Sequence, residues 1–345
     1  MKKDILRKDR KKEHIDHYLK SGYINYTLFD DVFVEHNALP ELNLSEIDTR
    51  IKFLGNNVNY PIMINAITGG TEFSREINRD LSKIAKEYNI PMAVGSQTIA
   101  LRDKESHESF KIVREIMGQE EVVIANLNAH ASIEDVKFSL DLLEADGIQL
   151  HLNPAQELVM KEGDRDFKGI LNNIQDIVSS IEKPVIVKEV GFGISKNIAQ
   201  SLYDAGVKYI DVSGVGGTNF IEIEDRRNDQ IDFSDIYSWG IPTALSLIQC
   251  RGISEELVLI ASGGIRTSLD ILKSIILGAD MVGISGQILK ELMEGGYERA
   301  NRYMKDLTYK LKALMLLTGS KNIEELKRVP YKVKGDLRDL LEDKI

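Results

Sequence analysis

The sequence repeats one unit eight times, a short apolar run followed by an amphipathic segment, and this repeat limits its possible folds more than any other feature. The apolar runs are continuous rather than alternating, which is typical of parallel strands covered on both faces. They span residues 60–67, 90–95, 121–127, 147–152, 184–190, 207–213, 257–262 and 279–285. Helical spacing marks residues 73–89, 105–118, 132–145, 168–182, 194–206, 241–252, 267–278 and 296–318. Eight such units predict a closed (β/α)₈ TIM barrel.

An open, doubly wound sheet is the alternative fold. A dinucleotide-binding version of it would need G-x-G-x-x-G directly after the first strand, where this chain has "TGGTEF". We therefore expect an N-terminal extension over 1–59, a barrel over 60–320 and a C-terminal tail over 321–345. The connection after strand 6, residues 214–240, is unusually long, and loops of that length in a compact domain are usually functional.

Charge and cysteine content exclude some functions. The chain has 44 Lys and Arg against 54 Asp and Glu, a net charge of −10, which argues against nucleic-acid binding. Cys250 is the single cysteine, which suits a reducing cytosol. No run approaches the roughly 18 apolar residues of a membrane span, and the N-terminus lacks a signal-peptide core. We predict a cytoplasmic protein without a membrane partner.

Polar or glycine-rich residues follow all eight predicted strands. Barrel enzymes carry their chemistry at this carboxyl end of the strands, so the pattern predicts a ligand pocket. After strands 7 and 8 stand "SGGIRT" (262–267) and "GISGQ" (283–287). Glycine lets backbone N–H groups approach an anion, and barrels often bind phosphate in these two loops. We expect a ligand that bears phosphate.

Two further strand ends carry charge. After strand 4, "HLNPAQE" (151–157) gathers an imidazole, two amides and a carboxylate around a proline. Lys188 stands within the Val/Ile run of strand 5, and a lysine is rarely buried unless it is paired. It either forms an ion pair with a barrel carboxylate or faces an electron-rich ligand.

The basic segment 1–20, with eight Lys and Arg against four acidic residues, is either a solvated helix or a cover for an anionic ligand.

Taken in order along the chain, these motifs resemble the flavin-dependent type 2 isopentenyl-diphosphate isomerases. The resemblance covers nearly the whole chain, from residue 10 to beyond 285. Two departures are visible, "ITGG" in place of the usual "MTGG" and Asn128 in place of a small residue. The motifs that carry it are "RKKEH" (10–14), "INAITGG" (64–70), "AVGSQTIALR" (93–102), "HLNPAQE", "VKEVGFGIS" (187–195), "DVSGVGGTNF" (211–220), "SWGIPTA" (238–244) and "SGGIRT".

The resemblance implies a reaction, its cofactors and their contacts. The reaction interconverts isopentenyl and dimethylallyl diphosphate for isoprenoid biosynthesis, with FMN, Mg²⁺ and NADPH as reductant of the flavin. The implied FMN contacts are Ile67, Thr68, Gly69, Ser96, Asn126, Lys188, Ser213 and Thr218, with Gly264, Ile265, Arg266, Ser285 and Gly286 around its phosphate. The implied substrate contacts are Arg10, Lys11, Ser96, Gln97, Thr98, Arg102 and Gln156, and the implied metal ligand is Glu157. His151, Asn153, Gln156 and Lys188 are the implied catalytic residues.

The expected mechanism is a 1,3-allylic proton shift in which reduced FMN acts as acid and base, Lys188 stabilises negative charge on the flavin and Gln156 positions the proton. A Glu or His as the main acid is the competing mechanism. The nearest rival function is an FMN oxidoreductase of the hydroxy-acid oxidase or glutamate synthase type. A purine-nucleotide dehydrogenase would need a cysteine in the loop after strand 6, and Cys250 lies elsewhere. A phosphate-ligand sensor would leave Lys188 and "HLNPAQE" without a role. The resemblance also implies a homo-oligomer, a tetramer or larger.

Overall fold

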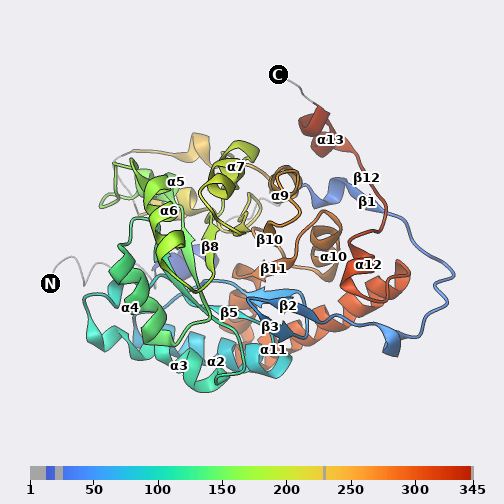
Figure 1. Ribbon diagram of the computed structural model, residues 1–345, viewed down its shortest axis with the longest axis horizontal. Helices are drawn as coiled ribbons and strands as arrows, with labels where there is room; N and C mark the ends of the chain where they lie inside the picture. The colour runs from blue at the N-terminus through green and yellow to red at the C-terminus, as the bar shows by residue number, and fades with distance from the viewer. Residues whose placement is uncertain (1–12, 20–25, 228–230, 343–345) are drawn as a thin grey trace.

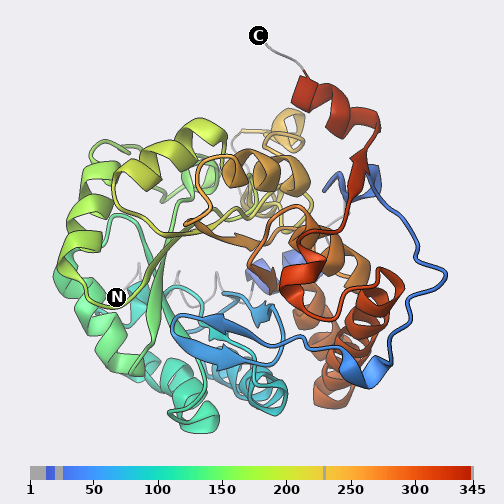
Figure 2. The same cartoon turned by 45° about the vertical axis from the view of Figure 1, so that its right-hand side comes forward.

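A closed barrel of eight parallel strands forms the body of the molecule (Figures 1 and 2). The computed structural model describes residues 13–19, 26–227 and 231–342. The strands close in the order β10-β11-β4-β5-β6-β7-β8-β9, and each pairs in parallel with its neighbours. They are β4 (Ile62–Ile64), β5 (Met92–Ala93), β6 (Val123–Asn128), β7 (Gly147–His151), β8 (Val185–Lys188), β9 (Tyr209–Asp211), β10 (Val258–Ala261) and β11 (Met281–Ile284). The predicted TIM barrel is confirmed. Each predicted apolar run contains a strand, except that β6 ends one residue beyond its run.

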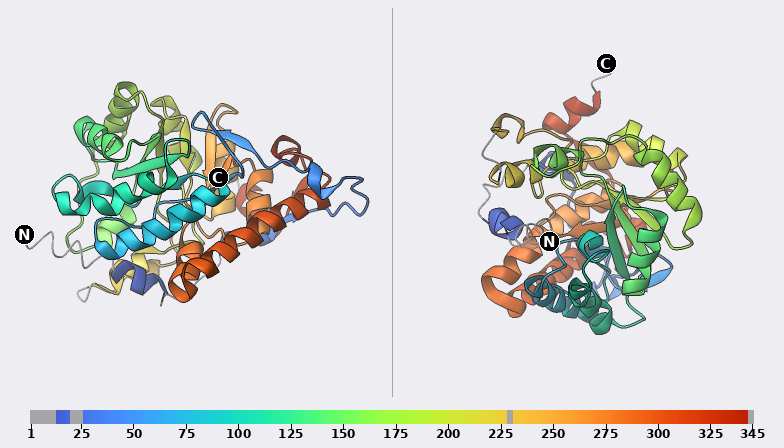
Figure 3. Two further views of the ribbon diagram at one scale, coloured as in Figure 1. Left: turned by 90° about the horizontal axis from the view of Figure 1, so that it is seen from below. Right: turned by 90° about the vertical axis from the view of Figure 1, so that its left-hand side faces the viewer.

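Helices surround the barrel where helical spacing predicts them. They are α2 (Glu72–Tyr88), α3 (Glu108–Met117), α4 (Ile133–Leu143), α6 (Ile170–Ser180), α7 (Lys196–Asp204), α9 (Thr243–Arg251), α10 (Ser268–Ile276) and α11 (Gly286–Leu317). The last is longer than the predicted 296–318, because a helical segment directly after β11 joins it across a kink at Gly296 (φ 67°). In Figure 3, α11 lies against α2 along one side of the barrel, and the two helices are in contact.

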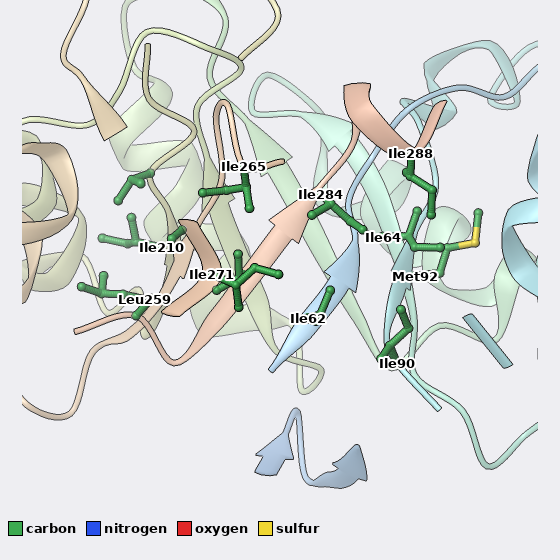
Figure 4. Close-up of a cluster of buried hydrophobic side chains, with 14 of the residues drawn as sticks. Ile62, Ile64, Ile90, Met92, Ile210, Leu259, Ile265, Ile271, Ile284 and Ile288 are labelled. Atoms are coloured by element: carbon green, nitrogen blue, oxygen red, sulfur yellow. The ribbon is translucent and has the colours of Figure 1, made fainter. Parts of the chain in front are cut away.

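The two faces of the barrel wall bury different side chains. Ile62, Ile64 and Met92 of β4 and β5 face the helices and belong to the large core that also holds Ile288 of α11 (Figure 4). Met63 belongs instead to a second cluster with Ala93, Ile124, Ile186, Ile260 and Met281, one residue from each of six barrel strands. Phe53 and Val58 of the hairpin β2 (Ile51–Phe53) and β3 (Asn56–Val58) join this inner cluster. An apolar plug thus fills one end of the barrel and leaves the other for polar side chains.

The segments at the two ends of the chain pack together. β1 (Val32–Val34) pairs antiparallel with β12 (Tyr331–Val333), so part of the N-terminal extension meets the segment that the sequence indicated as a tail. That segment is folded through residue 342. It also contains α12 (Ile323–Leu326) and α13 (Gly335–Glu342), whose Leu337 is fully buried. The remaining short helical turns near these ends are η1 (Phe29–Asp31) and η2 (Leu44–Glu46).

Short helices occupy the connections on the open side of the barrel. The connection after β7 holds α5 (Pro154–Val159), and the long connection after β9 holds α8 (Phe220–Asp225) and η5 (Ser234–Ile236). After β5 come η3 (Gln97–Ile99) and η4 (Lys104–Ser106). A helix over residues 13–19 lies on the same side. Within the described ranges, no helix has the length and hydropathy to cross a bilayer.

Candidate active site

A cavity of about 600 Å³ opens at the carboxyl ends of the barrel strands. Its wall takes residues from the segments that follow all eight strands and from the helix over 13–19. It brings together most of the residues that the sequence singled out. They are Ile67, Thr68, Ser96, Thr98, Arg102, Asn126, His151, Asn153, Gln156, Glu157, Lys188, Ser213, Thr218, Gly264, Ile265, Arg266, Ser285 and Gly286.

Four of the predicted contacts are not placed in this wall. Gln97 is fully buried behind it, where its Nε2 donates to Ser139 O (3.2 Å) and its Oε1 accepts from Asn126 N (3.0 Å). Its side chain is hydrogen-bonded to the backbone of β6 and does not face the cavity. Gly69 is backed by the ring of Phe110, which leaves no room for a side chain. Arg10 and Lys11 lie outside the described residues.

Glycines of two neighbouring loops interlock at one end of the cavity. Gly264, after β10, has φ +82°, and a Cβ there would collide with the backbone oxygen of Gly216, after β9. Arg266 Nη2 donates to the same Gly216 oxygen (3.2 Å). Thr267, directly after this loop, caps α10 in a reciprocal capping box. A glycine-rich loop, an arginine and the start of a helix are together typical of a phosphate site.

The "HLNPAQE" stretch forms a fixed hydrogen-bonded cluster. Pro154 is the first residue of α5, where its missing N–H costs nothing. Asn153 Nδ2 donates to Glu157 Oε1 (2.9 Å) and Gln156 Oε1 (3.2 Å). Its Oδ1 accepts from Asn128 Nδ2 (2.8 Å), so the unusual Asn128 supports Asn153 directly. The cluster holds the Glu157 carboxylate and the Gln156 amide on the cavity wall.

Glu224 of α8 is a site residue that the sequence did not single out. It is buried, and its Oε1 lies 2.9 Å from both His14 Nε2 and Gln156 Nε2, while Oε2 pairs with Arg227. Burial raises the pKa of this carboxyl, but His14, Gln156 and Arg227 outweigh burial and lower it to about 2. The only signal in the sequence was the length of the loop after strand 6.

The same contacts attach the helix over 13–19 to the mouth of the cavity. Besides His14, Glu13 accepts a hydrogen bond from Arg227 Nε (2.8 Å). The ring of Tyr18 lies against Gly286, in the loop after β11. The helix therefore reaches from the loop after β9 to the loop after β11, and His14, Ile15 and Tyr18 line the cavity.

Lys188 is a buried cation at the base of the cavity. It is 6% exposed, and its Nζ donates to the backbone oxygen of Glu189. Among the described residues, no carboxylate forms an ion pair with it, so the alternative of a barrel salt bridge has no support here. Glu189 turns away, with Oε2 accepting from the N–H groups of Val190, Gly191 and Phe192. Burial raises the pKa of Glu189 to about 7, although these bonds and Lys188 lower it.

Comparison with known proteins identifies the family. A relative from Geobacillus sp. (strain WCH70), an isopentenyl-diphosphate delta-isomerase, is 44% identical over 341 residues, which cover 99% of this chain and 97% of the relative. A relative of the same name from Bacillus licheniformis is 46% identical and covers 96% of this chain and 95% of its own length. The chain belongs to the isopentenyl-diphosphate delta-isomerase family. The resemblance stated from the motifs is confirmed.

A second comparison concerns the cofactor. The sequence model of the family described as FMN-dependent dehydrogenase matches residues 153–331, just over half of the chain, and supports FMN as a cofactor of this isomerase-family chain. Solved structures with the same fold include a mandelate oxidase (TM-score 0.66, 18% identity, 92% of this chain and 95% of that one). A lactate oxidase of Pediococcus acidilactici has TM-score 0.67 at 17% identity, over 92% and 87%. At such low identity these structures support the barrel fold alone.

Gly264→Asp is expected to give folded protein without flavin, because the new side chain and its negative charge would enter the glycine-lined end of the cavity. Gly55→Asp is the matched control, since Gly55 also has positive φ (+84°) but has nothing within 4 Å of its Cβ position. The flavin-to-protein absorbance ratio and circular dichroism measure the two effects. Arg266→Ala, which leaves the glycine backbone intact, should weaken FMN binding in the same direction. Stoichiometric flavin in Gly264→Asp would show that this end does not hold the phosphate.

Proposed function

We propose that the chain catalyses the interconversion of isopentenyl diphosphate and dimethylallyl diphosphate. The observation that carries the proposal is one cavity that combines the glycine-lined end, the buried Lys188 and the cluster around Glu157. Each has a part in the reaction, whereas an oxidoreductase of the hydroxy-acid oxidase type gives no role to the Glu157 cluster. The relatives that match nearly the whole chain, over 97% and 95% of their own lengths, are named for this activity.

The residues fit FMN. Its phosphate would be held by the loops of Gly264 and Gly286 together with Arg266. An added Cβ would collide with the Gly216 backbone at Gly264 and with the Tyr18 ring at Gly286. The ring system would lie over the base of the cavity, against Thr68, Asn126 and Lys188. Ile67, Ser96, Ser213, Thr218, Ile265 and Ser285 complete the proposed contacts, with Gly69 as a backbone contact.

The residues also fit Mg²⁺, with Glu157 as its protein ligand. In the part of the chain that the structure describes, no group of three or more His, Cys, Asp or Glu side chains is arranged to hold a metal. Mg²⁺ does not require one, because it is commonly bound by one or two carboxylates, waters and substrate phosphates. Glu157 lines the cavity with its carboxylate already oriented by Asn153 and by the N–H of Asp164 (2.9 Å). The diphosphate would supply the remaining charge.

Reduced FMN, when bound, supplies the acid and base for a 1,3-allylic proton shift. Lys188 stabilises negative charge beside it, and Gln156 is oriented at both ends, by Asn153 and by Glu224, to position the proton. His151 and Asn153 contact the substrate from the wall. Glu224 is an unsuitable main acid, because a carboxyl with a pKa of about 2 is ionised at neutral pH.

The remaining proposals concern the surroundings of the site. Ser96, Thr98 and Arg102 line the cavity and would contact the diphosphate. Arg10 and Lys11 would do so from the segment that precedes the helix over 13–19, and the buried Gln97 would act through Asn126. NADPH as reductant, a cytoplasmic location and a homo-oligomer of four or more subunits also belong to the proposal.

The direct test is incubation of the FMN-loaded protein with isopentenyl diphosphate, Mg²⁺ and NADPH without oxygen. Dimethylallyl diphosphate is measured as acid-labile product, because allylic diphosphates hydrolyse in acid. A separate sample of the air-oxidised protein, without NADPH, is mixed with a 2-hydroxy acid such as lactate. Bleaching of the oxidised flavin by lactate, with no acid-labile diphosphate formed, would favour the oxidoreductase.

A further inference from the structure

Five side chains form a continuous hydrogen-bonded chain beneath the cavity. His151 Nδ1 is 2.9 Å from Asn126 Oδ1, and Asn126 Nδ2 donates to Gln149 Oε1 (2.9 Å). Gln149 Nε2 donates to Asn65 Oδ1 (2.7 Å), and Asn65 Nδ2 donates to Asp211 Oδ2 (2.6 Å). Three amides thus connect an imidazole on the cavity wall with a carboxylate across the barrel.

The chain crosses the inside of the barrel. Gln149 is on β7 and Asn65 directly follows β4, and two strands separate β7 from β4 in the barrel order. Asp211 is on β9, and two more strands separate it from β4 on the other side. Asn65, Asn126, Gln149 and Asp211 are all at most 2% exposed. Water therefore does not compete for these bonds, and a mismatched pair of polar atoms there would be costly.

Asp211 and one backbone N–H set the direction of the bonds in the chain. Asp211 accepts hydrogen bonds from Asn65 Nδ2, Ser262 Oγ (2.6 Å) and Ser213 N (3.2 Å). Asn65 Oδ1 also accepts from the N–H of Ala66 (2.9 Å), which cannot reverse. Reversing the Asn65 amide would place oxygen against oxygen at Asp211, and N–H against N–H at Ala66 and Gln149.

We infer that Asp211 and the N–H of Ala66 fix the tautomer of His151 through these three amides. Because Asn126 Oδ1 is an acceptor, the proton of the neutral imidazole resides on Nδ1 and the lone pair on Nε2. Asp211 is then a positioning residue, as are Asn65 and Gln149. The neutral ring then presents Nε2 as a hydrogen-bond acceptor.

Nitrogen-15 NMR of histidine-labelled protein without flavin reads this tautomer directly, about two pH units above the ordinary imidazole pKa of about 6.5. The signal of His151 among the six histidines is assigned by its loss in His151→Gln. The expected wild-type pattern is a protonated Nδ1 and an unprotonated Nε2. An Nε2–H tautomer in the wild type would overturn the inference.

Asn65→Leu tests the anchored end of the chain, because Asn65 makes the bonds to both Asp211 and the Ala66 N–H. Gln149 Nε2 then loses its acceptor, and the expected result is loss of the Nδ1–H tautomer as the dominant form. Ser262→Ala is the matched control, because it removes one bond to Asp211 but keeps the bond from Asn65, and it should leave the tautomer unchanged. An unchanged tautomer in Asn65→Leu would overturn the inference.

Gln149→Leu interrupts the chain in its middle and serves also if Asn65→Leu does not fold. It should leave His151 as a mixture of tautomers, and adding Asn65→Leu to it should have no further effect on the ring. A ring that keeps Nδ1–H in Gln149→Leu would overturn the inference. Any effect of the His151 tautomer on turnover rests on the proposed function. The NMR measurement needs neither flavin nor activity, so the inference and the proposed function can fail independently.

Discussion

Air-oxidised protein given isopentenyl diphosphate and Mg²⁺ is expected to be nearly inactive. Reducing it with NADPH or dithionite without oxygen is expected to raise the rate of isomerisation at least about 10²-fold, which is the lower end of the effect of a positioned acid or base. The overall reaction is redox-neutral, so this dependence is the result expected if the reduced flavin is the acid and base and is not consumed. The cavity supports this expectation. Glu224, the buried carboxyl that bonds Gln156, has its pKa lowered to about 2 and is a poor proton donor at neutral pH.

The measurement is product formed per NADPH consumed in a sealed cell. Many turnovers for each NADPH would agree with a flavin that is reduced once and then reused. One NADPH per product would instead favour an oxidoreductase. Full activity of the oxidised protein would show that a side chain, rather than the flavin, is the acid and base. Glu157 and His151 would be the first candidates for substitution. Dithionite without NADPH separates the need for reduced flavin from the identity of the reductant.

The barrel could be predicted from the sequence because its evidence is local. Each buried parallel strand is a continuous apolar run, and each covering helix shows its own period, so eight weak signals add up without knowledge of any contact. The glycine-rich loops after β10 and β11 are likewise local, because close approach of a backbone requires glycine at the position itself. The structure adds the reason at Gly264, which is the backbone oxygen of Gly216.

The parts of the site that the sequence did not reveal depend on contacts between distant residues. Asn65 and Gln149 are 84 positions apart and look unremarkable in their strands, yet they bond across the barrel. Glu224 is one of several acidic residues in its loop, and only the folded chain shows that it meets His14 and Gln156. Gln97 illustrates the converse, since its neighbours in sequence line the cavity while its side chain turns behind the wall.

The contacts of the C-terminal segment are likewise between distant residues. In the part that the structure describes, through residue 342, β12 pairs with β1 near the other end of the chain, where Val32 is the partner of Val333. Strand pairing over such a separation leaves no local pattern, because a three-residue strand is too short to show alternation.

Glu157→Gln is expected to lower kcat/KM by roughly 10²–10³-fold, mainly because metal-dependent substrate binding becomes weaker. The substitution keeps the shape of the side chain and removes its charge. One unit charge at contact distance is worth about 4 kcal/mol at an effective dielectric near 20, and water and neighbouring amides would recover part of it. FMN should remain bound, because the proposed phosphate contacts are in the loops after β10 and β11, away from α5.

A Mg²⁺ titration at saturating reductant distinguishes a ligand from an acid. If Glu157 binds the metal, added Mg²⁺ should partly restore Glu157→Gln, since mass action can offset a weaker site. If it were the general acid, kcat would fall with an unchanged Mg²⁺ dependence, and the proposed role of the flavin would have to be abandoned. Glu162→Gln is the matched control, because Glu162 also lines the cavity but lies 3.8 Å from Arg227 at its rim. Its Mg²⁺ dependence should stay close to that of the wild type, because Glu162 is not the proposed metal ligand and has Arg227 within ion-pair distance.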